Sequence, residues 1–166
     1  MRFLFILFCL VFVSSCDGLS SNLFEADGEW LDRAIRNNDI SAVMAIIDKS
    51  SSNVNRVIGA RYEERPIHVA AYYGRDDIIK YLAMKGADLN ALNKGGYRTA
   101  LLTAIWKKHE STALLLLSLG ADPSIKTSSG LSACTVANRE IARGAQLLAV
   151  IHALPNCTVQ VPSDCK

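Results

Sequence analysis

The chain has 166 residues, 50% of them hydrophobic, and its 18 lysines and arginines against 16 aspartates and glutamates give a formal net charge of +2. This length fits one modest domain. The near-neutral balance, without long runs of like charge, argues against the basic surface typical of nucleic-acid binding and against a disordered charged tail.

The first fifteen residues have the order of a secretory signal. Met1 and Arg2 give a positive end, residues 3–13 form an unbroken apolar run, and the small Ser14 and Ser15 follow. This run is too short to cross a bilayer, which takes roughly 20 residues in a helix. The alternative is a buried core helix, but no amphipathic periodicity continues the run. We therefore predict a signal peptide over residues 1–15.

The four residues Val13-Ser14-Ser15-Cys16 resemble the bacterial lipobox, in which the signal is cut before the cysteine and the thiol carries a diacylglycerol. The resemblance implies lipid attachment at Cys16 and a membrane-anchored chain that faces the periplasm, an oxidising compartment. Residues 16–28 would then be a flexible tether. Asp17 resembles the signal that retains lipoproteins in the inner membrane of enteric bacteria. A plain signal-peptidase site near Ser15 is the alternative.

A repeated pattern organises the rest of the chain. Residues 65–90 begin with R-P-I-H-V-A-A and end with G-A-D-L-N, and the same order returns 34 residues later over residues 99–124. A weaker copy begins at Gly130, and a degenerate one precedes the two clear copies. These motifs resemble the ankyrin repeat, with its T-P-L-H-x-A and G-A-D-x-N signatures. The resemblance implies an all-α solenoid of about four stacked helix-turn-helix units with extended loops between them over residues 29–154, followed by a tail over residues 155–166.

Several residues of the repeat have structural roles. Pro66 stands at the start of a first helix, where its missing N–H does no harm. Gly86 and Gly120 end second helices, in the left-handed conformation that glycine adopts most easily. In the ankyrin pattern the histidine at position 68 is a structural hydrogen-bonding residue, so we do not assign His68 to catalysis.

The two ends of the array are expected to be polar, because a terminal repeat has only one neighbour. Side chains that suit an outer amino-terminal face are those of Arg33, Arg36, Asn37, Asn38 and Asp39, and side chains that suit a carboxy-terminal cap are those of Arg139, Glu140 and Arg143. Gly144 is expected inside the second helix of the last copy, which it would weaken. Cys134 takes the leucine position of its signature and is interpreted as a small core residue.

Two cysteines remain in the tail. Cys157 and Cys165 are predicted to form a disulfide, because an exported chain meets an oxidising environment and the loop between them is short. The alternative is a pair of free thiols.

The ankyrin resemblance also implies where a partner would bind: the loop tips and the exposed side of the first helices. Tyrosine, tryptophan and arginine are the residues most enriched at binding hot spots. The positions that match this surface are Arg61, Tyr62, Glu64, Tyr72, Tyr73, Lys94, Tyr97, Arg98, Trp106 and Lys107. The alternative for some of the rings is that they pack between helices.

No sequence motif for a nucleophile, a phosphate loop or a zinc helix is present, and His109 and His152 have no metal-ligand spacing, so we expect a non-enzymatic protein without metal or cofactor. We expect it to be a monomer when unbound and to bind another protein rather than nucleic acid. Small ankyrin lipoproteins resemble, in general build, immunity proteins that neutralise toxic effectors delivered to the periplasm. The alternative is a periplasmic scaffold or stress-protection factor that supports an envelope enzyme.

Overall fold

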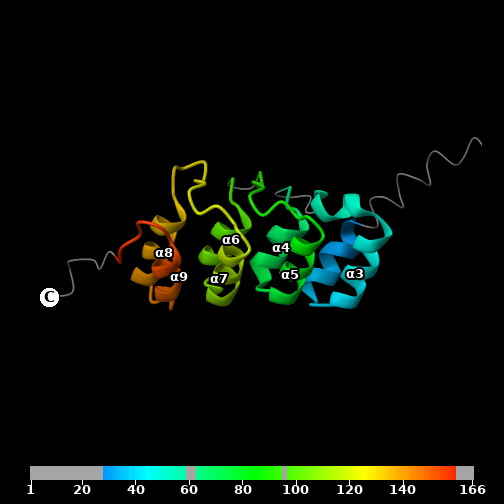
Figure 1. Cartoon of the computed structure of the whole chain (residues 1–166), viewed down its shortest axis with the longest axis horizontal. Helices are drawn as coiled ribbons and strands as arrows, with labels where there is room; N and C mark the ends of the chain where they lie inside the picture. The colour runs from blue at the N-terminus through cyan, green and yellow to red at the C-terminus, as the bar shows by residue number, and fades with distance from the viewer. Residues whose placement is uncertain (1–27, 59–62, 95–96, 160–166) are drawn as a thin grey trace, which may run out of the picture.

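The computed structural model describes residues 28–58, 63–94 and 97–159. These residues are helical, without a strand, and form four helix pairs that lie side by side in one row (Figure 1). The first pair consists of residues 28–36 and α3 (Ile40–Lys49), and a 3-10 turn, η2 (Ser51–Asn55), follows it. The second pair is α4 (Pro66–Tyr73) with α5 (Asp76–Met84), and the third is α6 (Ala100–Trp106) with α7 (Glu110–Ser118). The fourth pair is α8 (Ala133–Ala142) with α9 (Leu148–Ala153). The predicted all-α solenoid of about four stacked units is confirmed.

Some predictions fall outside the described residues. These are the signal peptide over residues 1–15, the lipid-bearing Cys16 and most of the tether. Gly28, which we assigned to the tether, is already helical and buried, so it belongs to the first helix pair. Within the part of the chain that is described, no helix is long and apolar enough to cross a membrane.

The turn inside each pair requires a residue at positive φ. Asn38 (59°), Gly74 (65°), Lys108 (64°) and Gly144 (85°) occupy that position in the four pairs. The prediction that Gly144 lies inside the second helix of the last pair is therefore wrong. α8 ends at Ala142, and Gly144 supplies the left-handed turn that glycine adopts without a steric cost.

Local chemistry sets the helix ends. Pro66 is the first residue of α4. The hydroxyl of Thr99 accepts a hydrogen bond from the backbone N–H of Leu102 at the start of α6 (3.2 Å), and Ser132 caps α8 in the same way (3.3 Å). Gly86 and Gly120 follow α5 and α7 with φ of 84° and 93°. The last three repeats thus start on a cap or a proline, and the two interior repeats end on a glycine.

One apolar seam runs through all four pairs. Ala70, Ala71 and Ala104 are completely buried, so the first helices approach one another closely. The large side chains of the seam are also fully buried and come from every pair: Leu31, Ile47, Ile67, Leu82, Leu101, Ile105, Leu116 and Leu147. Burying one such leucine or isoleucine contributes roughly 1.5–3 kcal/mol relative to leaving it in water. No single pair could close this seam, so the neighbours stabilise one another.

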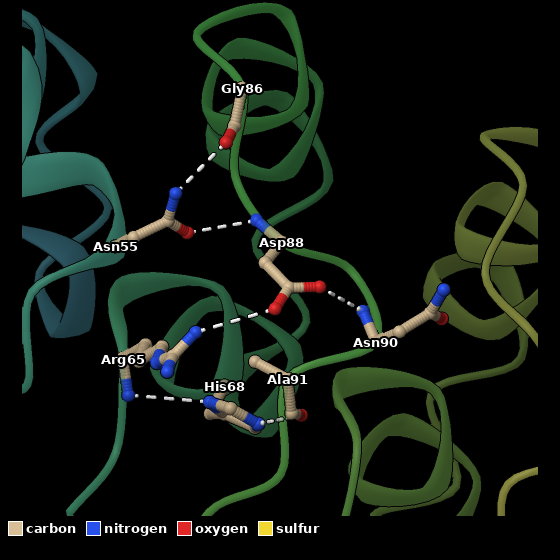
Figure 2. Close-up of polar contacts among 7 residues, drawn as sticks. All are labelled: Asn55, Arg65, His68, Gly86, Asp88, Asn90 and Ala91. Atoms are coloured by element: carbon tan, nitrogen blue, oxygen red, sulfur yellow. Dashed lines mark hydrogen bonds and ion pairs between the residues drawn. The ribbon is translucent and has the colours of Figure 1, made fainter.

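Asparagine side chains tie successive loops together (Figure 2). The amide of Asn55 donates to the Gly86 carbonyl (3.0 Å) and accepts from the Asp88 backbone N–H (2.8 Å). One repeat later, Asn90 accepts in the same way from the backbone N–H of Asp122 (2.8 Å). The equivalent position of the next copy is Ser124, for which no such bond to the last repeat is present in the described residues. The series of ties therefore stops before the fourth pair.

His68 is completely buried and connects two segments of its repeat (Figure 2). Its Nδ1 accepts from the backbone N–H of Arg65 (3.2 Å), and its Nε2 lies 2.8 Å from the Ala91 carbonyl, to which it donates. Burial is the main cause that lowers the pKa of His68, so the ring is neutral in the fold. It is a structural hydrogen-bonding residue in this environment.

The residue before each interior second helix reaches back to the preceding pair. Arg75 donates to the Arg36 carbonyl (2.6 Å), and His109 Nε2 lies 3.1 Å from the Tyr72 carbonyl. A Cβ atom at Gly74 would come within 3.0 Å of the His109 ring, so the glycine is needed for space as well as for its φ.

The disulfide differs from the predicted pairing. Cys157 bonds to Cys134 of α8, with an Sγ–Sγ distance of 2.02 Å and a Cα–Cα distance of 5.6 Å, and Cys165 lies outside the described residues. The sequence favoured Cys165 because it is near in the chain, whereas the return of α9 along α8 brings Cys157 back to Cys134. Cys134 is accordingly half-buried and crosslinked rather than a free core residue. Asn138 of α8 also donates to the Thr158 carbonyl (3.0 Å), so residues 157–158 are held against the last pair.

Of the three residues that we expected to form a polar carboxy-terminal cap, two are exposed and one, Glu140, is buried. The Glu140 side chain is 3% exposed and faces three cations: Arg143 (3.0 Å), Arg139 (3.6 Å) and Lys108 (3.9 Å). Arg139 and Arg143 are exposed as predicted, but Glu140 is buried. Its carboxylate can be buried because the surrounding cations compensate its charge.

Candidate protein-binding surface

Three aromatic rings gather where the first helices of the two interior pairs end. Tyr72 and Tyr73 close α4, and Trp106, at the position equivalent to Tyr72 one repeat on, closes α6. The centroids of Tyr72 and Tyr73 lie 4.9 Å apart edge to face, and those of Tyr72 and Trp106 lie 6.5 Å apart. Trp106 is 37% exposed and the tyrosines are half-buried, so the rings both pack and present surface.

Cations cover these rings. The Lys107 ammonium lies 3.9 Å from the Tyr72 centroid and 4.7 Å from that of Trp106, and the Arg98 guanidinium lies 4.4 Å from the Trp106 centroid. Tyr73 carries Arg36 at 5.3 Å and Arg75 at 5.9 Å. Such contacts contribute roughly 0.5–2 kcal/mol each. We call this set the cation–aromatic strip: Arg36, Tyr72, Tyr73, Arg75, Arg98, Trp106 and Lys107.

We predicted that Arg36 lies on an outer amino-terminal face. In the structure it belongs to the cation–aromatic strip instead. Its guanidinium donates to the Tyr73 hydroxyl (2.7 Å) and to the Asp32 carboxylate (2.6 Å), and the Asp32 hydrogen bond raises the pKa of Arg36. The error is one of register: the first copy is degenerate, so the equivalence of Arg36 with Tyr72 was not visible. The spacing of 36 residues between these two, against 34 between Tyr72 and Trp106, is the signal that was missed.

Glu64 lies beside this strip, half-buried. Its burial raises the pKa of the Glu64 carboxyl, while the charge of Arg36 and, to a smaller degree, that of Arg98 act in the opposite direction. Its backbone carbonyl accepts from the Ile58 N–H (2.8 Å), which fixes the segment that leads into α4.

Lys94 and Tyr97 lie on the loop before α6 and are not part of the cation–aromatic strip. Lys94 is exposed and forms an ion pair with Glu63, and Tyr97 is 51% exposed with a φ of 50°. Asn93, which the sequence did not single out, holds the base of this loop. Its buried side chain accepts from the Arg98 backbone N–H (3.0 Å), and its own N–H donates to the Arg98 carbonyl (3.1 Å).

The structure thus brings together half of the proposed contact residues. Tyr72, Tyr73, Trp106, Lys107 and Arg98 form one continuous strip, and Glu64 lies at its edge. Lys94 and Tyr97 are separate from it, and Arg61 and Tyr62 lie outside the described residues. Among the residues that are described, no group of three histidine, cysteine, aspartate or glutamate side chains is arranged to hold a metal ion.

Residues 31–127 match a family model described as ankyrin repeats in three copies. The match covers more than half of the chain, and the chain belongs to the ankyrin-repeat family. Ankyrin domains are typically non-catalytic modules that bind other proteins on the extended surface of the stacked repeats. The described repeats therefore have the fold of a protein-binding module.

Similar curated proteins contain this segment within much longer chains. Identity is 36% to a Transient receptor potential cation channel subfamily A member 1 of Drosophila melanogaster, over 57% of this chain and 8% of the relative. It is 32% to the BTB/POZ domain and ankyrin repeat-containing protein NPR1 of Malus hupehensis, over 64% and 17%. It is 34% to the BCL-6 corepressor-like protein 1 of Homo sapiens, over 66% and 6%. The chain spans less than a fifth of each relative, so the likeness concerns the repeats.

Proposed function

We propose that this chain is a non-catalytic binding module, tethered in a bacterial envelope through Cys16, that acts as an immunity protein against a toxic effector working in the periplasm. The cation–aromatic strip carries the proposal. It offers a preformed contact face of three rings and four cations, the residue types that dominate binding energy at protein interfaces.

The contacts within the strip favour recognition without rearrangement. The rings are fixed by one another and by their cations, so little side-chain entropy is lost when a partner covers them. A small module with one fixed face is suited to cover the active site of an effector or to block its approach to the membrane.

Two features support export. The first is the signal-like segment with its lipobox at residues 13–16. The second is the Cys134–Cys157 disulfide, because disulfides persist in oxidising compartments and are rare in the cytosol. An exported, lipid-bearing chain would be held at the membrane surface, and Asp17 favours the inner membrane.

The binding experiment uses the product of the gene adjacent to that of this chain as the candidate effector. We expect each of the single variants Tyr72→Ala, Tyr73→Ala and Trp106→Ala to weaken binding of the effector by about 2 kcal/mol, which is roughly thirtyfold in Kd. The control is Met84→Ala, a change at a 74% exposed side chain on the second helix α5, which should leave Kd unchanged. Cells that export the effector should grow only with the unaltered chain or the control. Unchanged capture by all three ring variants would remove the proposed face, and capture without protection would favour a scaffold.

The anchor is tested by the mass of the mature protein. We expect a chain that starts at Cys16 and carries the additional mass of its acyl groups, and a Cys16→Ser variant that is released from the membrane fraction. A mature chain of unmodified mass would show a plain secreted protein instead.

A further inference from the structure

A hollow of about 270 Å³ lies at the end of the cation–aromatic strip, between α6, α8 and the loop that joins the third and fourth pairs. Trp106 and Arg98 form one wall, Arg139 of α8 another, and Ser128 and Leu131 line the loop side. This volume is slightly below the roughly 300–1,000 Å³ of a site for a drug-sized ligand, and it is large enough to admit a side chain.

The loop wall is preformed. The backbone of Thr127 donates to the Leu131 carbonyl (3.0 Å), and the Leu131 N–H donates back to the Thr127 hydroxyl (3.1 Å). Gly130, at a φ of 77°, allows this tight return. The hydroxyl of Ser129 pairs with that of Thr127 (3.0 Å), whereas Ser128 makes no hydrogen bond to another residue in the described part of the chain. The Ser128 hydroxyl is therefore available to a ligand.

Positive charge is in excess around the hollow. Arg98 and Lys107 form no ion pair with a carboxylate of the described residues, and both lie against the Trp106 ring. Arg139 (3.6 Å) shares the single Glu140 carboxylate with Arg143, which lies closer to it (3.0 Å), and with Lys108 (3.9 Å). One buried carboxylate cannot neutralise three cations, and the charge of Arg98 is the smallest of the named influences on the Glu64 carboxyl.

From this geometry we infer that the hollow is the subsite that receives an acidic side chain, aspartate or glutamate, of the partner protein. Arg98 and Arg139 pair with the carboxylate, Ser128 donates a hydrogen bond to it, and Leu131 contacts its methylene groups. Guanidinium groups are the preferred donors to carboxylates, because two parallel N–H bonds match two oxygens. The inference rests on the proposed protein-binding function and specifies the chemistry of the partner.

The test uses a short peptide as the probe, N-acetyl triglutamate amide, with N-acetyl triglutamine amide as its uncharged match. The indole N–H signal of Trp106 is followed by NMR on the full mature chain and is assigned with a Trp106→Phe variant. We expect the triglutamate to shift this signal in a saturable way that weakens at about 0.5 M salt, and the triglutamine to leave it in place.

Variants locate the effect. Arg98→Gln and Arg139→Gln should each raise the apparent Kd of triglutamate about tenfold. Arg143→Gln removes the same charge just past the end of α8, outside the residues that line the hollow, and should change Kd by less than about twofold. An equal shift with triglutamine, or an equal loss in Arg143→Gln, would overturn the inference. A triglutamine peptide with a free carboxyl end that shifts the Trp106 signal more strongly than triglutamate amide does would also overturn the inference. The hollow would then receive the carboxyl terminus of a chain rather than an acidic side chain.

This outcome is separable from that of the proposed function. If the effector is captured through Tyr72 and Tyr73 but triglutamate does not move the Trp106 signal, the acidic subsite is wrong and the binding function stands. If triglutamate binds as expected and the effector is not captured, the subsite stands and the immunity role falls.

Discussion

The two interior helix pairs and the last pair are held in different ways. The interior pairs, α4 to α7, are joined by polar ties that recur once per repeat: Asn55 and Asn90 to the next loop, and Arg75 and His109 to the preceding helix. The last pair, α8 and α9, has Ser124 and Ala145 at the corresponding positions, which lack these reaching side chains. It has the Cys134–Cys157 disulfide and the cations around Glu140 in their place. The last repeat thus has a covalent bond and a cluster of ion pairs where the interior repeats have recurring polar ties.

The largest effect should come from the disulfide. Changing both Cys134 and Cys157 to serine should lower the free energy of unfolding by about 3 kcal/mol in the chain-entropy model, since the crosslink spans 23 residues. Because a solenoid loses stability locally, hydrogen exchange should accelerate in α8 and α9 far more than in α4 to α7.

The control for this prediction is Cys165→Ser, which should leave both the free energy of unfolding and the exchange pattern unchanged. Reductant should destabilise the unaltered chain and have no effect on the double variant. Uniform acceleration over all repeats would contradict the idea that the disulfide serves the last pair.

A smaller loss is expected at His68 in the interior. Replacing it by alanine leaves the buried Ala91 carbonyl without its partner, which costs about 1–3 kcal/mol, and exposes the part-buried Arg65 N–H to solvent. The measurement is urea unfolding, and the exchange pattern should now change in α4 and α6 before α8.

The same residue gives a pH dependence of defined sign. Because burial lowers the pKa of His68, the unfolded chain takes up a proton before the folded chain does as the pH falls from about 7 through the ordinary histidine pKa of about 6.5, and stability is lost in that range. The raised pKa of Glu64 has the opposite effect, because it increases the stability of the fold as the pH falls. The contribution of His68 is therefore measured as the difference between the unaltered chain and a His68→Gln variant. We expect the unaltered chain to lose more stability than this variant over the range. Parallel pH profiles would contradict a buried neutral histidine.

The smallest effect concerns the asparagine ties. Asn90→Ala removes the acceptor of the Asp122 N–H and should cost about 1 kcal/mol. Ser124→Ala, at the equivalent position one repeat on, should change the free energy of unfolding by less than about 0.5 kcal/mol, because its side chain makes no such tie to the last pair as far as the chain is described. Equal costs at the two positions would show that the interior and the end are held alike.

Much of the fold was predictable because ankyrin repeats are made by local chemistry. Pro66, Thr99, Ser132, Gly86 and Gly120 mark helix starts and ends through their own backbone and side-chain properties, which act within a few residues. The ring positions Tyr72 and Trp106 followed from the repeat spacing. Their assembly into one strip with Arg36 did not, because the first copy had lost the signature that fixes its register.

The sequence by itself determined the repeat family, the four helix pairs and the face on which the aromatic residues lie, because each depends on spacing along the chain. Only the tertiary structure decided that Cys157 pairs with Cys134, that Glu140 is buried among cations, and that Arg98 and Arg139 share one hollow. These contacts join residues that are not at equivalent positions of the repeat, so the repeat spacing does not predict them and only the stacking of the helices brings them together.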